Sequence, residues 1–268
     1  MKLKYNSTGE LPLSKYLKTL EIFNDKYMSD LDKNIEILAI YSDTTVDDIL
    51  KLRPEAVGAH MADMSNVISS YKPSNSKHPK NIKINDNVYT VNYNIGKLNM
   101  AQYIDFQQTI VNKNYLENLP ALLSIFIIPK GHKYNDDYDI LELRNILENN
   151  MTLDEALSIV FFFENEIDKF NKTQTAVLQV DVEDYEMDDA RQADEGDAED
   201  STEPAVDAGE QFNRYLSLID EVSEVLRQSF NETWEMNIYA FFTYAAYSRW
   251  KTKKQQEAIA RWQNKKIK

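Results

Sequence analysis

The sequence predicts a mainly α-helical protein: a helical N-terminal domain with a small β-hairpin, a disordered acidic linker and a short C-terminal helical hairpin. Helix breakers are scarce, since the 268 residues include 6 glycines and 7 prolines. Long segments place apolar residues every three or four positions, which is typical of amphipathic helices. One short segment carries nearly all of the net charge. These patterns predict a domain over residues 1–180 with the hairpin near 82–93, a linker over 181–210 and a C-terminal piece over 211–268.

Residues 1–71 predict a small helical bundle. Apolar residues at helical spacing indicate helices over 13–23 and about 30–41. Thr45 is a suitable N-cap for a third helix, because its hydroxyl can accept a backbone N–H three residues later. Pro54 suits the first turn of a fourth helix. The apolar face of that fourth helix consists of Val57, Met61, Met64, Ile68 and Tyr71.

The period changes after residue 81. Ile82 and Ile84, and then Tyr89 and Val91, alternate with polar residues on either side of an Asn-Asp-Asn step. Asn and Asp tolerate left-handed backbone conformations, so this step predicts the turn of a β-hairpin. An isolated hairpin is only marginally stable in water, and we therefore expect it to pack on helices.

Two further features complete the N-terminal domain. The segment 119–128 is apolar on all sides, so periodicity alone allows a buried helix or a central strand; Pro120 favours the helix. Thr152 and Glu155 form a capping box that predicts the start of a long helix. The core face of that helix consists of Ala156, Ile159, Val160, Phe163, Ile167 and Phe170.

The acidic segment 181–210 holds 14 acidic residues and one arginine, a net charge of −13 out of −14 for the chain. Its few apolar residues would bury too little surface to offset a backbone ordering cost of about 1–2 kcal/mol per residue. We interpret it as a self-repelling linker that keeps the protein soluble. The less favoured alternative is a nucleic-acid mimic that occupies a basic groove.

The C-terminal piece 211–268 concentrates aromatic and basic residues. All three tryptophans lie in the last 35 residues, and the segment 249–268 has 8 basic residues against one glutamate. A piece this short buries so much aromatic surface poorly by itself, so we expect it to bind a partner. The predicted partner-binding residues are Trp234, Phe241, Phe242, Tyr247, Trp250 and Trp262.

No catalytic, cofactor-binding or metal-binding motif is present, and we expect a non-enzymatic protein without a cofactor. The chain has no cysteine, and its histidines His60, His78 and His132 are scattered. The run from Asp136 to Asp139 is similar to part of a cation-binding loop, but Leu147 stands where an EF-hand requires glutamate. We therefore interpret these residues as a solvated loop.

The layout of a helical domain, an acidic joint and a short helical piece resembles the tail assembly chaperones of tailed bacteriophages. The resemblance is carried by the arrangement W-x-M-N-I-x-x-F-F-x-x-x-A-Y from Trp234 to Tyr247, and by the segments IGKLNMAQYIDFQQTI and LPALLSIFIIPKG. It implies a protein of the host cytoplasm, or of the virion, that binds the tail-tube or tape measure protein. It also implies that the C-terminal piece is a partner-binding extension.

Three alternatives remain open from the sequence. The protein could be a structural or accessory component of a phage virion, or a nucleic-acid-associated regulator that uses the basic C-terminal helix; nucleic acid is the less favoured partner. Self-association is a further possible contact. The longest apolar run, Leu119 to Pro129, is about half the length of a membrane span, so we expect no membrane insertion.

Overall fold

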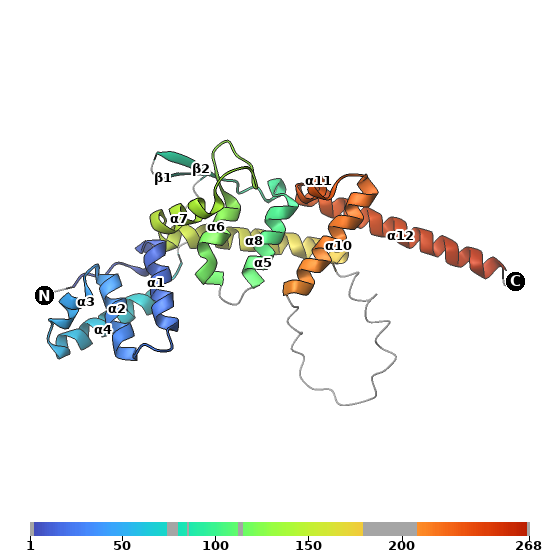
Figure 1. Cartoon of the computed structure of the whole chain (residues 1–268). Coiled ribbons are helices and arrows are strands. Elements are labelled where there is room, and N and C mark those ends of the chain that lie inside the picture. The colour runs from blue at the N-terminus through green and yellow to red at the C-terminus, as the bar shows by residue number, and fades with distance from the viewer. Residues whose placement is uncertain (1–2, 74–79, 85, 112–114, 179–207, 267–268) are drawn as a thin grey trace, which may run out of the picture. The chain divides into compact units, whose positions relative to one another are not determined.

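The computed structural model describes residues 3–73, 80–84, 86–111, 115–178 and 208–266. These residues form helices and a small antiparallel sheet (Figure 1), which confirms the prediction of a mainly α-helical protein. The chain divides into two compact units. Unit 1 comprises Met1–Tyr93 and Lys113–Glu164, and unit 2 comprises Asn94–Asn112 and Asn165–Lys268.

Unit 1 begins with the predicted helical group. Its elements are η1 (Thr8–Glu10), α1 (Leu13–Asn24), α2 (Asp30–Ser42), α3 (Val46–Leu50) and α4 (Pro54–Ser70). Thr45 caps α3 by accepting the Asp48 N–H at 3.2 Å, as the sequence predicts. Leu38, Ile49 and Met64 are buried in one apolar cluster that joins α2, α3 and α4. Ile68, predicted on the apolar face of α4, is 38% exposed, whereas Met64 is buried in this cluster and Val57, Met61 and Val67 pack against it.

The sheet of unit 1 has three strands in the order β1-β2-β3, one more than the predicted hairpin. β1 (Asn81–Ile84) and β2 (Asn87–Val91) pair antiparallel, with Ile82 opposite Tyr89. β3 (Ile127–Pro129) pairs with the other edge of β2. The apolar segment 119–128 is therefore a helix only to Phe126, as α6 (Leu119–Phe126). Its last residues change to strand because the open edge of β2 supplies partners for their backbone groups.

The remaining helices of unit 1 pack beneath this sheet region. They are η3 (Tyr115–Asn118), α7 (Ile140–Asn150) and the first part of α8 (Leu153–Leu178). The predicted capping box of α8 is present, since Glu155 N donates to the Thr152 hydroxyl and Thr152 N donates to the Glu155 carboxylate. The rings of Phe126 and Phe163 stack with centroids 3.6 Å apart, so α6 is held on α8 by a buried aromatic contact.

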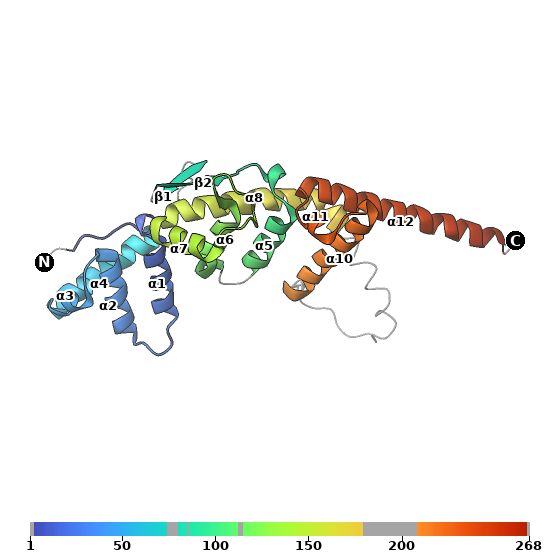
Figure 2. The ribbon, with the colours of Figure 1, turned by 45° about the horizontal axis from the view of Figure 1, so that its top comes forward.

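Unit 2 is built around α5 (Met100–Val111), which contacts α10, α11 and α12. Its other elements are η2 (Ile95–Lys97), the part of α8 from Asn165 onward, α10 (Ala208–Leu226), α11 (Phe230–Trp234) and α12 (Ile238–Lys266). α10 and α12 pack against each other, with the short α11 between them in the chain, which confirms the predicted C-terminal helical hairpin. Figure 2 shows the same elements from a second direction.

A short antiparallel backbone pairing joins the C-terminal piece to the segment before α5. Met100 N donates to Met236 O at 2.8 Å, and Ile238 N donates to Leu98 O at 3.0 Å. The Asn237 side chain donates to Gly96 O and accepts the Tyr239 N–H at the start of α12. Asn237 therefore caps α12 and fastens it to the loop before α5.

The units differ from the division predicted from the sequence. α5 and the end of α8 lie within the predicted N-terminal domain 1–180, but they pack with the C-terminal piece because the apolar faces of α10 and α12 are buried against them. The predicted linker 181–210 lies outside the described residues up to 207, and its last three residues begin α10. The end of α8 and the start of α10 flank it and both belong to unit 2, so it does not connect one unit to the other.

We predict that the two halves of unit 2 remain associated when the acidic segment is cut. Residues 190–196 would be replaced by the site of a sequence-specific protease. After cleavage, both fragments should elute together in size-exclusion chromatography, because the pairing at Met100 and Ile238 and the buried aromatic rings do not depend on chain continuity. Adding Ile238→Asp, which places a charge at a fully buried position, should separate the fragments. Separation without that substitution contradicts this account of unit 2.

Candidate functional site

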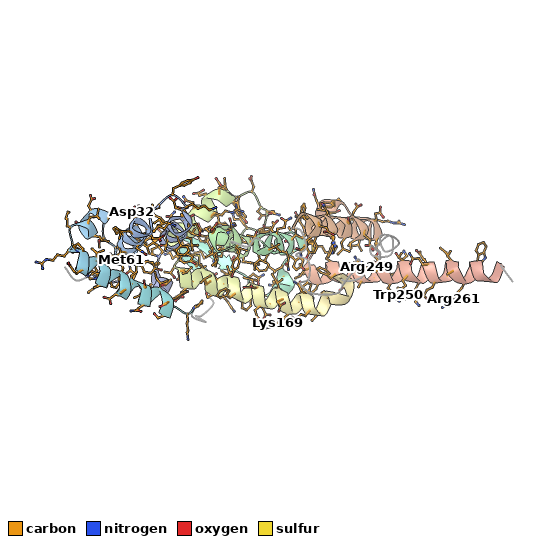
Figure 3. All side chains as sticks on the ribbon, turned by 90° about the horizontal axis from the view of Figure 1, so that it is seen from below. Asp32, Met61, Lys169, Arg249, Trp250 and Arg261 are labelled. Carbon is orange, nitrogen blue, oxygen red and sulfur yellow. The ribbon has the colours of Figure 1, made fainter. Side chains whose placement is uncertain are left out.

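α12 changes character at Arg249. Before this residue, one side of the helix is buried in unit 2 by Ile238, Phe241, Phe242, Ala245 and Ser248. After it, no described residue of α12 is buried. Figures 1 and 2 show this second half extending away from α10 and α11, and Figure 3 labels Arg249, Trp250 and Arg261 along it. The buried stripe ends because Thr252, Gln255 and Gln256 occupy the positions where it would continue.

The second half of α12 is helical through local interactions alone. Lys, Gln, Ala and Arg favour helix, and Glu257 pairs with Lys254 at 3.0 Å and with Arg261 at 3.9 Å. The hydrogen bond from Lys254 lowers the pKa of Glu257 below its ordinary value. Exposed ion pairs of this kind stabilise a helix weakly, and most helical stability in proteins comes from packing. This half of α12 would therefore gain stability from a binding partner.

One side of α12, from Tyr247 onward, combines aromatic and charged residues. Tyr247 and Trp250 are 50% and 57% exposed, and their rings stack with centroids 6.0 Å apart. Lys254 and Arg261 follow Trp250 at spacings of four and seven residues, which places them on the same side of the helix. Trp262, 58% exposed, borders a shallow depression that Lys254 and Arg261 also line. We call these five residues the basic-aromatic face.

Phe241 and Phe242, which the sequence predicts as partner-binding residues, belong to the core of unit 2. Both have no exposed surface. The Phe242 ring contacts Tyr103 of α5 and Phe170 of α8 edge-on, with centroids 5.7 and 5.3 Å apart. Neither phenylalanine is accessible to a partner while unit 2 is folded. The prediction for them is wrong because α5 and α8 cover this side of α12.

Tyr103 is the centre of this core, and its place on an apolar face is the one sequence signal for that role. Its hydroxyl donates to the Asn171 side chain at 2.8 Å and lies 3.3 Å from the Tyr215 hydroxyl. Burial raises the pKa of Tyr103 well above its ordinary value, so the residue stays neutral. The contacts join α5, α8 and α10 and bring the two helices that flank the acidic segment together.

Trp234 lies in α11 and is half-buried, with its ring stacked on Phe230 at a centroid distance of 5.7 Å. Ser229 and Glu232 form a capping box at the start of this helix. Met236, Asn237 and Ile238 make the pairing to the segment before α5. Most of the arrangement that resembles the tail assembly chaperones is therefore explained by packing within unit 2, and Tyr247 is its member on the basic-aromatic face.

The histidines and aspartates considered for chemistry have structural partners. The Tyr5 hydroxyl and His60 Nδ1 are hydrogen-bonded, and the Tyr138 ring lies edge-on to His132. Asp136 accepts the Lys133 N–H at 2.6 Å. Asp139 caps α7 by accepting two backbone N–H groups. His78 lies outside the described residues, and within the described part of the chain no group of three or more His, Asp and Glu side chains could hold a metal ion.

No protein-family model, no curated protein and no solved structure matches the chain. Among the described helices, none is both long enough and apolar enough to span a bilayer. The basic-aromatic face is a surface that the fold of unit 2 leaves exposed, and it combines aromatic side chains with positive charge.

We predict that substitution of two aromatic residues of α12 has very different effects on the stability of unit 2. Phe242→Ala should lower the free energy of unfolding of unit 2 by about 3–5 kcal/mol, because it leaves a cavity between α5 and α8. Trp250→Ala should change it by about 0.5 kcal/mol or less, as expected at an exposed position. Urea titrations followed by far-ultraviolet circular dichroism measure both. Equal losses would show that Trp250 packs on the unit as Phe242 does.

Proposed function

We propose that the protein is a non-enzymatic assembly chaperone of the host cytoplasm that binds a tail-tube or tape measure protein of a tailed bacteriophage. The observation that supports the proposal is the exposed, stacked pair of Tyr247 and Trp250, which lies where the buried side of α12 ends. The resemblance of the sequence to tail assembly chaperones supplies the class of partner.

The basic-aromatic face has the composition of a binding hot spot. Trp, Tyr and Arg are enriched among the residues that contribute most to protein interfaces, and a well-packed one contributes about 2 kcal/mol or more. A protruding helix with anchors three and four residues apart suits insertion into an apolar groove of a partner. Unit 2 holds the first half of α12 through Asn237 and Phe242, so the second half is presented in a fixed direction relative to α10.

The acidic segment has a different role in this proposal from that of a tether. The end of α8 and α10 lie in the same unit, so the segment between them does not connect separate units. The position of α12 is set by its packing on α5. A net charge of −13 in the segment would instead keep a complex with an apolar client soluble.

A second candidate function follows from the charge of α12. Eight basic residues against one acidic residue between Arg249 and Lys268 would attract a nucleic-acid backbone, and the exposed tryptophans could stack on unpaired bases. This would make the protein a nucleic-acid-associated regulator. A structural or accessory role in the virion would instead keep the protein bound to its client in the finished particle.

The test is binding of the purified tail-tube and tape measure proteins of the phage that encodes the chain. We expect the double variant Trp250→Ala, Trp262→Ala to bind at least about tenfold more weakly, because two anchors of the basic-aromatic face are lost. Tyr27→Ala is the matched control, since it removes a fully exposed aromatic side chain from unit 1 and should leave binding unchanged. Isothermal titration calorimetry gives the affinities.

Salt distinguishes the second candidate. Affinity for a protein client held by aromatic anchors should not fall between 50 and 200 mM salt. Affinity for single-stranded nucleic acid held through about six phosphates should fall by about 10³-fold over that range. Binding that falls steeply with salt and is unaffected by the two tryptophan substitutions would refute the chaperone proposal and favour the regulator.

A further inference from the structure

Two segments of opposite charge flank the helical hairpin of unit 2. The second half of α12, with the residues that follow it to Lys268, has a net charge of +7, from eight basic residues and Glu257. Glu257 already pairs with Lys254 and Arg261, so this part of the chain cannot neutralise its own charge. Residues 181–207 have a net charge of −12, from thirteen acidic residues and Arg191. We propose that residues 181–207 dock on the basic-aromatic face of α12 in the same molecule.

Both ends of the acidic segment are connected to helices of unit 2, the unit that also contains α12. The structure describes α8 up to Leu178 and α10 from Ala208, and Tyr103 joins Asn171 of the first to Tyr215 of the second. α10 in turn packs on α12. The docking therefore takes place within unit 2 and requires no rearrangement of its core.

The length of the segment matches the length of the face. Residues 249–266 of α12 extend over about 27 Å at about 1.5 Å per residue. The 29 residues between Leu178 and Ala208 have a contour of about 95 Å, so a loop with neighbouring ends reaches about 45 Å out and back. That reach exceeds the length of the charged part of α12.

Attachment to the same chain favours this occupant over a free one. A segment held at both ends beside its site has an effective concentration in the millimolar range. Exposed opposite charges attract one another over a Debye length of about 10 Å at 0.1 M salt, and residues 181–207 offer thirteen acidic side chains for such contacts. The exposed side chains of Lys251, Lys253 and Lys254 are the contacts that we expect first.

Docking would lower the apparent affinity of the basic-aromatic face for other ligands. A ligand of the basic-aromatic face must displace the acidic segment. Its apparent dissociation constant is therefore the intrinsic one divided by the fraction of molecules in which the face is free. If the segment occupies the face in nine-tenths of the molecules, the apparent dissociation constant rises about tenfold. Anionic ligands are affected most because they use the same cations. This inference needs no client and is independent of the function proposed above.

Zero-length cross-linking of the full chain tests the contact. A water-soluble carbodiimide joins carboxylates to amines that already touch, and an equal mixture of ¹⁴N- and ¹⁵N-labelled protein separates links within one molecule from links between two. At micromolar protein and 50 mM salt, we expect links within one molecule from residues 181–207 to Lys251, Lys253 and Lys254. These links should be lost at 500 mM salt. Lys18 and Lys26, exposed in unit 1, are the comparison sites.

Three results would overturn the proposal: no links to α12, equal linking to Lys18 and Lys26, or links mainly between two molecules, which would assign the acidic segment to a second copy.

A binding measurement completes the test. The chain with every Asp and Glu of 181–207 changed to Asn and Gln should bind a fluorescent polyglutamate peptide at least about tenfold more tightly than the unchanged chain at 50 mM salt. Equal affinities would refute docking, whereas client binding could still hold.

Discussion

The arrangement of unit 2 depends on the antiparallel pairing between the segment before α5 and the segment before α12. Met100 and Ile238 supply its backbone hydrogen bonds, and the Asn237 side chain adds a bond to Gly96 and caps α12. A backbone pairing with a cap fixes both the position and the direction of a helix. Everything else about α12, including which residues it buries and where it leaves the unit, follows from this start.

The aromatic core turns that pairing into a stable unit. Phe242 and Phe170 surround Tyr103, whose hydroxyl is satisfied by Asn171 and Tyr215. A buried hydroxyl without partners would cost free energy, so the polar contacts and the ring packing support each other. Since these residues come from α5, α8, α10 and α12, the same core also brings together the two ends that flank the acidic segment.

Unit 2 contains an acidic segment and a basic segment that lie apart in the sequence. The acidic residues lie between α8 and α10, and the basic residues lie on the half of α12 that the core does not cover. Because α10 packs on α12, the helix that follows the acidic segment contacts the helix that carries the basic residues, although α11 separates the two helices along the chain. The exposed half of α12 therefore combines positive charge with aromatic side chains.

The sequence by itself determined the helical class, the hairpin at Ile82 and Tyr89, the caps at Thr45 and Thr152 and the charge of both C-terminal segments. Each of these depends on residues close together in the chain. Only the tertiary structure decided that β3 joins the sheet and that α5 belongs with the C-terminal piece. It also decided that Phe242 is buried while Trp250 is exposed on the same helix. The physical reason is that burial depends on which distant segment lies opposite, and local periodicity does not contain that information.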